Sequence, residues 1–294
     1  MRLGRFVQRV AGVVVLVGAA VVIVEAGVED PAGPRSGTAA TVGATAAGGR
    51  HLADPSRVRV ATYNLHSGYD RDGDYSADRI AGVIRDAGVD VVGLQEVNAL
   101  WAPLDRLIAY HGGGDMAGVF APTERKWWRD AFGNGLMSRL PVGGWRAVPL
   151  PRHRSASGHR NLLVADVAVG AGRALRVIVT HVDRQAGRAD QLREAVAAFL
   201  AAPAPAVLVG DLNTHASDPQ LAALLVAPGV VEAHGPHGLR RGGQIDWIFA
   251  RGAAVVAAGR VESDASDHDL LWADLDLRAD PSATDPPTEV VRRD

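Results

Sequence analysis

Eight polar residues that can bind a metal ion or move a proton lie at the ends of apolar segments of this 294-residue chain. The clearest example is VLVGDLNTHASDP (207–219), in which an apolar run leads directly into Gly210, Asp211 and Asn213. Side chains at the carboxyl ends of strands lie at one reachable edge of an α/β sheet, so we expect the eight to meet there. They come from six segments and are Asn64, Glu96, His181, Asp211, Asn213, Asp246, Asp267 and His268.

Each of these residues, taken alone, also has a structural explanation. Asn64 could close a turn, and Glu96 could cap a helix. Asp211 could form an Asx turn, as aspartate after glycine often does. His181 could be a hydrogen-bonded core histidine, and Asp267 could begin a helix. Six segments that all end in an amide, a carboxylate or an imidazole are better explained by shared chemistry than by six separate turns.

The chemistry that this set favours is metal-assisted hydrolysis of a phosphoester. Four carboxylates and two amides offer the oxygen ligands of Mg²⁺, Mn²⁺ or Ca²⁺. Zinc is a competitor because two histidines are present, but the chain has no cysteine and no HxxxH pair. A cation beside imidazole and amide groups suits attack of water on a phosphoryl group. Asp246 near His268 would be a carboxylate that orients an imidazole base.

The elements that must position these residues are short strands with a few helices between them. Apolar periodicity predicts helices around Ile80–Ala87, with Ser76 as N-cap, and around 192–200, and Asp218–Pro219 predicts a third helix start. Many strands with few helices indicate two packed sheets with helices outside, an α/β sandwich. The predicted strands are 58–63, 89–94, 135–137, 162–169, 175–180, 206–209, 245–249 and 270–277.

The motifs around these residues resemble those of the endonuclease/exonuclease/phosphatase superfamily, which has the fold of deoxyribonuclease I. The resemblance covers residues 57–277 and implies a four-layer α/β sandwich, with two packed mixed β-sheets flanked by helices. The motifs, in family order, are TYNLHSG (62–68), GLQEV (93–97), GNGLMSRLPV (133–142), GHRNLLVADV (158–167), VIVTHVD (177–183), VLVGDLNT (207–214), GGQIDWIFA (242–250) and SDHDLLWADL (266–275).

The resemblance also implies a role for each site residue. Glu96 is expected to be the principal ligand of Mg²⁺ (or Mn²⁺ or Ca²⁺), with Asn64 and Asp267 completing the metal site directly or through water. Asp211 and Asn213 are expected to position the attacking water and the scissile phosphate.

The remaining implied roles concern the phosphate oxygens and the protons. His268, oriented by Asp246, would polarise the phosphate or act as the base. His181 would stabilise the transition state or protonate the leaving oxygen. Arg160 would contact a phosphate oxygen, with a plain surface arginine as the alternative. The nuclease branch pairs its first histidine with a glutamate, for which Glu124 is the nearby candidate.

The N-terminal segment predicts export. Arg2, Arg5 and Arg9 precede an unbroken apolar run (10–24), which indicates a signal peptide or signal anchor within residues 1–26. A flexible linker (27–56), the catalytic domain (57–277) and a disordered tail (278–294) follow from composition. We therefore expect an extracytoplasmic protein, secreted or anchored to the cytoplasmic membrane by its N-terminal segment.

The substrate is less well defined by the sequence. Removing the eight basic and eight acidic residues of the flanks from totals of 31 and 33 leaves 23 and 25 in the domain. A near-neutral domain is unlike a tight DNA binder, because phosphate contacts dominate that affinity. Two local features suit phosphate, base or membrane contact, with a solvated loop and core packing as their alternatives. They are the cluster Arg152, His153, Arg154, His159 and Arg160, and the pair Trp127–Trp128 beside Arg125, Lys126 and Arg129.

Three functional hypotheses remain open. The first is an exported or membrane-anchored, metal-dependent phosphodiesterase or phosphatase with a phospholipid-like or small phosphorylated substrate. The second is an extracellular endonuclease that acts on DNA or RNA. The third is a non-catalytic binding module, against which the complete set of polar residues argues. No protein partner is predicted.

Overall fold

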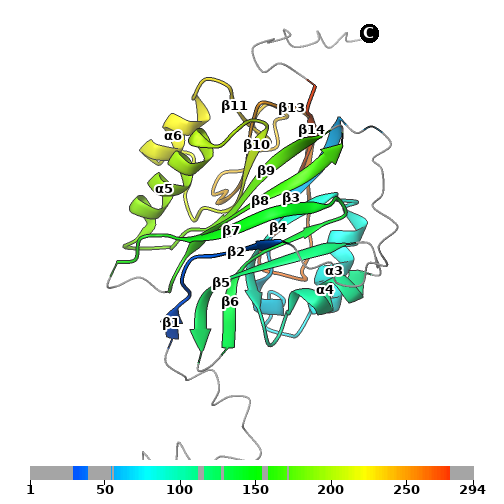
Figure 1. The fold of residues 1–294 in the computed structure, drawn as a ribbon, viewed down its shortest axis with the longest axis vertical. Helices are drawn as coiled ribbons and strands as arrows, with labels where there is room; N and C mark the ends of the chain where they lie inside the picture. Colours follow the sequence, from blue (N-terminus) through cyan, green and yellow to red (C-terminus); the bar gives the residue numbers. More distant parts are fainter. Residues whose placement is uncertain are drawn as a thin grey trace, which may run out of the picture.

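The computed structural model describes residues 29–38, 54, 56–111, 116–126, 129–153, 158–170 and 172–278. The predicted N-terminal export segment, Trp127–Trp128, Arg154 and nearly all of the predicted tail lie outside these residues. Two seven-stranded sheets pack face to face (Figure 1). Within the described ranges, no helix combines the length and apolar character that a bilayer crossing requires.

Each sheet is mixed, because one parallel pair lies within an otherwise antiparallel arrangement. The parallel pairs are β3 with β4 in the first sheet and β9 with β10 in the second. The first sheet has the order β1 (Glu29–Pro31), β5 (Ala117–Lys126), β6 (Arg129–Ser138), β4 (Val91–Asn98), β3 (Arg57–Asn64), β14 (Leu270–Asp276), β13 (Ala254–Val261). The second has the order β11 (Val230–Glu232), β12 (Asp246–Arg251), β10 (Ala206–Asp211), β9 (Arg173–His181), β8 (Asn161–Gly170), β7 (Val142–Pro149), β2 (Arg35–Thr38).

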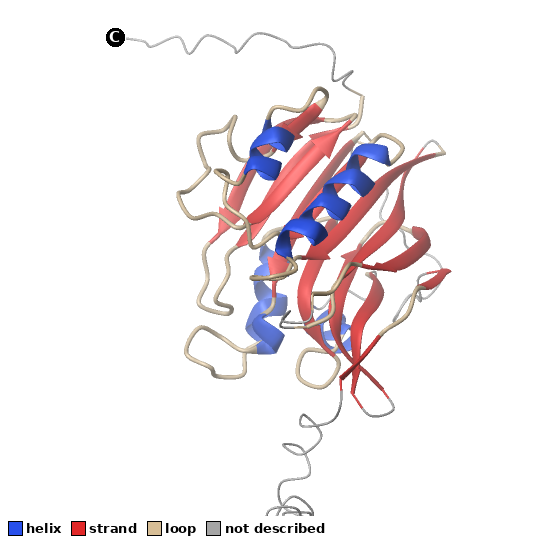
Figure 2. Ribbon diagram, turned by 90° about the vertical axis from the view of Figure 1, so that its left-hand side faces the viewer, coloured by secondary structure: helices blue, strands red, loops and turns tan. Residues whose placement is uncertain are grey.

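Helices cover the outer faces of both sheets, as Figure 2 shows for the second sheet. The helices α3 (Ala77–Asp86) and α4 (Leu104–His111) share an apolar cluster with the first sheet, and α5 (Arg188–Ala201) and α6 (Pro219–Leu225) share another with the second. A third cluster fills the space between the sheets. The predicted four-layer α/β sandwich is therefore confirmed.

The predicted helices form where apolar spacing and capping residues placed them. Asp218 caps α6, because its side chain accepts a hydrogen bond from the Gln220 backbone N–H, and Pro219 follows at the first helical position. Ser76 stands at the N-cap position of α3, but its hydroxyl donates to the Ala265 carbonyl instead (2.6 Å). That bond ties α3 to the segment that carries Asp267.

The predicted flexible linker is wrong for residues 29–38. They form β1, which pairs with β5 at the edge of the first sheet, and β2, which pairs with β7 at the edge of the second. Between them, Ala32 is buried and donates its N–H to the Thr123 carbonyl. We call residues 29–38 the edge strap. Its sequence lacks an apolar period, because backbone hydrogen bonds to two exposed strand edges, rather than a buried face, hold it in place.

Candidate active site

Three site residues of the second sheet lie on one rung across three adjacent strands. His181 at the end of β9 pairs with Asp211 at the end of β10, and Asp211 pairs with Asp246 at the start of β12. Gly210 makes this rung possible. Its φ is +152°, and a Cβ there would overlap the Thr180 carbonyl oxygen of β9. Only glycine fits such a close approach of two backbones.

The first sheet presents its residues by a local irregularity. Asn64 ends β3 and pairs with Gln95 of β4. Glu96 was predicted to follow the end of a strand, but it lies within β4, at a β-bulge between Leu94 and Val97. Its φ is +56°, in the left-handed region. A bulge re-aims a side chain that regular alternation would send to the opposite face, and here it brings the Glu96 carboxylate to Asn64.

Asn64 joins the two sheets at the site. Its Nδ2 donates to Glu96 Oε1 (3.3 Å) and to Asp211 Oδ2 (3.2 Å). Its Oδ1 accepts from the His66 backbone N–H (3.1 Å), so the amide oxygen faces away from both carboxylates. The predicted role of Asn64 as a metal ligand, directly or through water, stays a prediction. In this arrangement the Asn64 amide nitrogen holds Glu96 and Asp211 together.

His181 is buried and lies between the two carboxylates. Its Nε2 is 3.5 Å from Asp211 Oδ2 and 3.2 Å from Asn213 Nδ2, and its Nδ1 is 4.0 Å from Glu96 Oε1. Burial, together with the positive charge of Arg160, lowers the pKa of His181 well below 6.5. The ring is therefore neutral at pH 7, and the Asn213 amide that donates to Nε2 leaves its proton on Nδ1.

Asn213 reaches His181 through a tight turn rather than an extended segment. Its φ is +45°, its N–H donates to Asp211 Oδ1 (2.9 Å), and its Nδ2 also donates to the Val182 carbonyl (2.8 Å). The Asx turn that was considered as a structural explanation for Asp211 is thus present. The same turn also places the Asn213 amide against His181, so the structural and the chemical explanations hold together.

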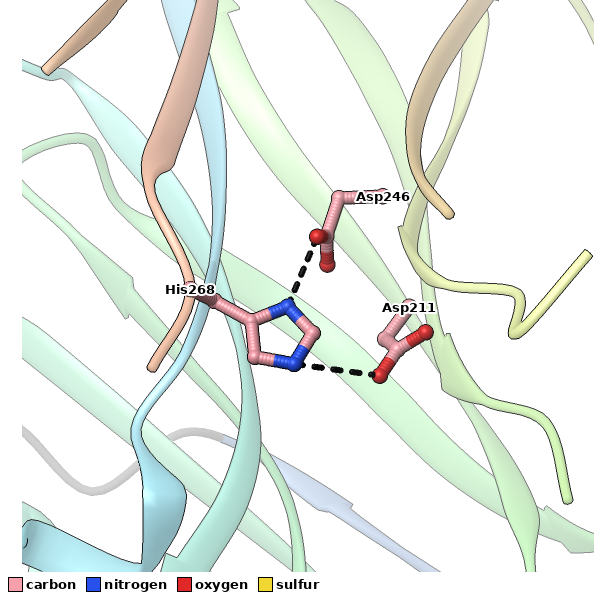
Figure 3. Close-up of side chains that lie close together, drawn as sticks. All are labelled: Asp211, Asp246 and His268. Carbon is pink, nitrogen blue, oxygen red and sulfur yellow. Dashed lines mark hydrogen bonds and ion pairs between the residues drawn. The ribbon is translucent and has the colours of Figure 1, made fainter. Parts of the chain in front are cut away.

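His268 forms a dyad with Asp246 and also faces Asp211 (Figure 3). Nδ1 lies 2.7 Å from Asp246 Oδ2, while Nε2 lies 3.8 Å from Asp211 Oδ2 and 3.9 Å from Asp267 Oδ1. Burial alone would lower the pKa of His268, but the bond to Asp246 and the charges of Asp246, Asp211 and Asp267 raise it to about 9. Burial and the Asp246 charge raise the pKa of Asp211 to about 7.

Arg160 is buried, which excludes the plain surface arginine. Its side chain lies against Phe132, with Cζ 6.0 Å from the ring centroid, and its charge reaches His181. Glu124 is buried in β5 and accepts the backbone N–H of His159 (3.2 Å), on the segment that leads to Arg160. Its predicted pairing with His181 stays a prediction.

A divalent cation fits the charge of this network. Four carboxylates are linked through Asn64, His181 and His268, and Asp246 Oδ1 and His181 Nδ1 are buried without a hydrogen-bond partner among the described residues. Ligand atoms of Asp211, Asp246 and His268 lie within 4.8 Å of one another. However, His268 Nδ1 and Asp246 Oδ2 are already bonded to each other at 2.7 Å. The Glu96 carboxylate, which contacts an amide and an imidazole, is the better candidate ligand.

Sequence reasoning missed several groups beside the site. His66, with Nδ1 4.0 Å from Asp267 Oδ1, stands two residues after Asn64 in the motif TYNLHSG. A pocket of about 280 Å³ opens beside the dyad and is lined by Arg71, Arg241 and Arg260 as well as by Asp267. No sequence signal marked these arginines, because their meeting depends on how the fold brings two loops and strand β13 together.

Comparisons with solved structures agree with this architecture. An endonuclease/exonuclease/phosphatase from Beutenbergia cavernae is 27% identical over 76% of this chain and 72% of its own, with a TM-score of 0.60. TDP2 from D. rerio, crystallised with a single-strand DNA product, is 19% identical over 75% of this chain and 99% of its own, with a TM-score of 0.57. The human nocturnin catalytic domain is 17% identical over 75% and 93%, with a TM-score of 0.58.

A sequence comparison with curated proteins finds no match. The sequence profile of the Endonuclease/Exonuclease/phosphatase family matches residues 61–268, which contain every predicted site residue. The chain therefore belongs to the Endonuclease/Exonuclease/phosphatase family of phosphoester-cleaving hydrolases.

Proposed function

We propose that this protein is an exported or membrane-anchored phosphodiesterase or phosphatase that depends on a divalent cation. The observation that carries the proposal is that Glu96 and Asn64 of one sheet contact His181 and Asp211 of the other at a single edge, beside the dyad. Such a set of carboxylate, amide and imidazole groups can bind a phosphoryl group and accept the proton of an attacking water.

The residues of this chain divide the chemistry between them. Asp211, with a pKa of about 7, is poised to accept the proton of the attacking water. The His268 imidazolium, fixed by Asp246 at Nδ1, presents Nε2 to a phosphoryl oxygen. Neutral His181 and the Asn213 amide act as uncharged hydrogen-bond partners, and Arg160 adds positive charge beside His181.

Glu96 and Asp267 would hold the divalent cation, which when bound supplies positive charge for the phosphoryl oxygens and lowers the pKa of water. Asn64 contributes by keeping Glu96 and Asp211 in contact through its amide nitrogen. Mg²⁺ suits an oxygen-rich site of few protein ligands.

A substrate panel tests the proposal. The protein is incubated with bis(4-nitrophenyl) phosphate, sphingomyelin, plasmid DNA and RNA, with Mg²⁺, Mn²⁺ or Ca²⁺ and with EDTA. We expect turnover of at least one phosphoester that EDTA and Glu96→Ala both abolish. Turnover that survives both changes would overturn the metal-dependent mechanism.

An extracellular endonuclease is the second candidate. TDP2, a structural neighbour, was crystallised with a single-strand DNA product, and the arginine-lined pocket beside the dyad offers contacts for a polyanion. Against it stands the near-neutral charge of the domain. Nicking of plasmid DNA with no turnover of lipid would favour this candidate.

The proposed location rests on the apolar run 10–24 after three arginines. Fractionation of expressing cells tests it: we expect the full chain in the membrane or the medium, and recovery in the cytosol would contradict export.

A further inference from the structure

The pocket beside the dyad has a wall that the phosphoryl chemistry does not need. It measures about 280 Å³, and Asp246, Asp267 and His268 form the side toward the site. The lining also includes Arg71, Arg241 and Arg260, which come from the loop before α3, the loop before β12 and strand β13. We call this cavity the arginine pocket.

Two of these arginines share one carboxylate. Asp269 Oδ2 lies 3.3 Å from Arg260 Nη1 and 3.7 Å from Arg241 Nη1. The Arg260 side chain is 15% exposed, also donates to the Leu239 carbonyl and lines the pocket. Arg241 is half-exposed and additionally pairs with the exposed Glu262. Neither pairing satisfies all the donors of a guanidinium fork.

Arg71 adds a charge that no carboxylate neutralises among the described residues. It is exposed and lines the pocket, and its backbone N–H donates to the Asp264 carbonyl. The neighbouring Arg240 differs, because it donates twice to the buried Glu232 carboxylate and is therefore occupied. Positive charge is thus left available on the side that faces the dyad.

Gln244 supports the idea that the pocket awaits a polar ligand. Its exposed fraction is 9%, and it lines the pocket wall. Its Oε1 faces Arg260 Nη2 at 3.5 Å, and its Nε2 has no hydrogen-bond partner among the described residues. An unsatisfied buried donor is costly, and a small rotation of the amide toward an anion in the pocket would satisfy it.

We propose that the arginine pocket binds a second phosphate group of the substrate, close in the molecule to the phosphoester that is cleaved. The inference rests on the proposed function, since it places the scissile phosphoryl group at His268, Asp211 and Asn213. Because the pocket adjoins His268, a phosphate one sugar or polyol unit away extends into it. Guanidinium forks match the geometry of phosphate oxygens. A cationic headgroup such as choline would be repelled by the positive charge of the three arginines.

A matched pair of substrates tests this inference. Thymidine 5′-(4-nitrophenyl phosphate) and its 3′-phosphorylated form release the same chromophore and differ by one phosphate. With Mg²⁺ present, we expect a higher kcat/KM for the phosphorylated form, chiefly through KM. Arg71→Ala and Arg241→Ala should each lower the ratio of the two kcat/KM values by about tenfold, the effect of one charge-assisted contact.

Two further variants sharpen the result. Arg193→Ala removes an exposed arginine of α5 that pairs with Asp190, and it should leave the ratio unchanged. Glu262→Gln releases Arg241 from its exposed partner and should raise the ratio. Thermal unfolding of each variant shows whether it is folded.

The outcomes separate the inference from the proposed function. If no phosphoester of the panel and neither nucleotide is hydrolysed with any divalent cation, the proposed function fails. If another phosphoester of the panel is hydrolysed but neither nucleotide is, the second-phosphate site is overturned while the hydrolase stands. If both are hydrolysed with equal kcat/KM, or if the ratio survives Arg71→Ala and Arg241→Ala together, the second-phosphate site is overturned while the hydrolase stands.

Discussion

The two sheets deliver their site residues by opposite means. The second sheet uses regularity: His181, Asp211 and Asp246 occupy one rung of three hydrogen-bonded strands. The first sheet uses irregularity: Glu96 reaches the site from a bulge with a left-handed backbone. The regular side fixes distances through the ladder itself, whereas the irregular side holds a residue in a conformation of higher energy.

Mutations in the two sheets should therefore affect stability and activity differently. Residues of the rung support one another through shared strand pairing, so changing the backbone there should damage both stability and activity. Glu96 contributes chemistry at some cost to stability, so its removal should damage activity alone. Four measurements test this contrast.

The largest effect is expected for Asp211→Asn, at the centre of the rung. Loss of the carboxylate should lower kcat by about 10³-fold or more, because the group that accepts the proton is gone. The folded-state pKa of Asp211 is raised to about 7. Its ionisation therefore weakens the metal-free protein as pH rises from about 4 to 7.

Asn at position 211 removes that penalty. Thermal unfolding in EDTA should show a higher Tm for Asp211→Asn than for wild type at pH 8, with the difference vanishing near pH 4. A lower Tm for Asp211→Asn at pH 8 would contradict the prediction that the ionised, buried Asp211 carboxylate destabilises the protein.

The next effect is expected for Asp246→Asn, at the edge of the rung. Without its carboxylate partner, the buried imidazole of His268 loses its main stabilising bond, and its pKa should fall from about 9 toward or below 6.5. We expect kcat at pH 7 to fall by about 10²-fold.

NMR titration of His268 in the metal-free protein measures this pKa. The control is Asp274→Asn, which breaks the Asp274 pairing with Arg59 on β3 and β14 and should leave His268 unchanged. A His268 pKa that stays near 9 in Asp246→Asn would show that Asp246 does not set its charge.

A backbone effect of intermediate size is expected for Gly210→Ala. The added Cβ meets the Thr180 carbonyl at a φ of +152°, so the free energy of unfolding should fall by about 3 kcal/mol. Gly229→Ala is the matched control, because its φ is +70° and nothing lies within 4 Å of its Cβ. It should cost about 1 kcal/mol, the strain of the left-handed region alone. Equal losses in urea unfolding would show that the close approach of β9 and β10 is unimportant.

The smallest change in stability is expected at Glu96. Glu96→Gly relieves the left-handed backbone at φ +56° while adding freedom to the unfolded chain, so its free energy of unfolding should stay within about 1 kcal/mol of wild type. Glu96→Ala keeps the strain and should be less stable than Glu96→Gly by about 1 kcal/mol. Both should lose activity. If Glu96→Gly were instead the less stable variant, the bulge would not be strained.

Strand ends predict the placement of His181 and Asp211 but not that of Asp246, which begins β12 and reaches the same edge because β12 runs antiparallel to β10. The apolar runs before His181 and Asp211 mark strand ends directly, and strand ends share an edge. The bulge at Glu96 left no such mark, because GLQEV reads as an ordinary strand end. Strand β7 was missed because only Ala147 on it is fully buried, so it has no apolar alternation. Arg71 and Arg241 were missed because long-range folding alone brings their loops together.

The edge strap has a consequence for the order of assembly during synthesis. Pro31 pairs with Glu124, and Arg35 pairs with Ala147, so the strap residues have no partner strand until roughly a hundred more residues have been made. They must wait, unpaired, for β5 and β7 to emerge. The edge strap is therefore among the last segments to pair, and it adds the outermost strand to each sheet after β5 and β7 have formed.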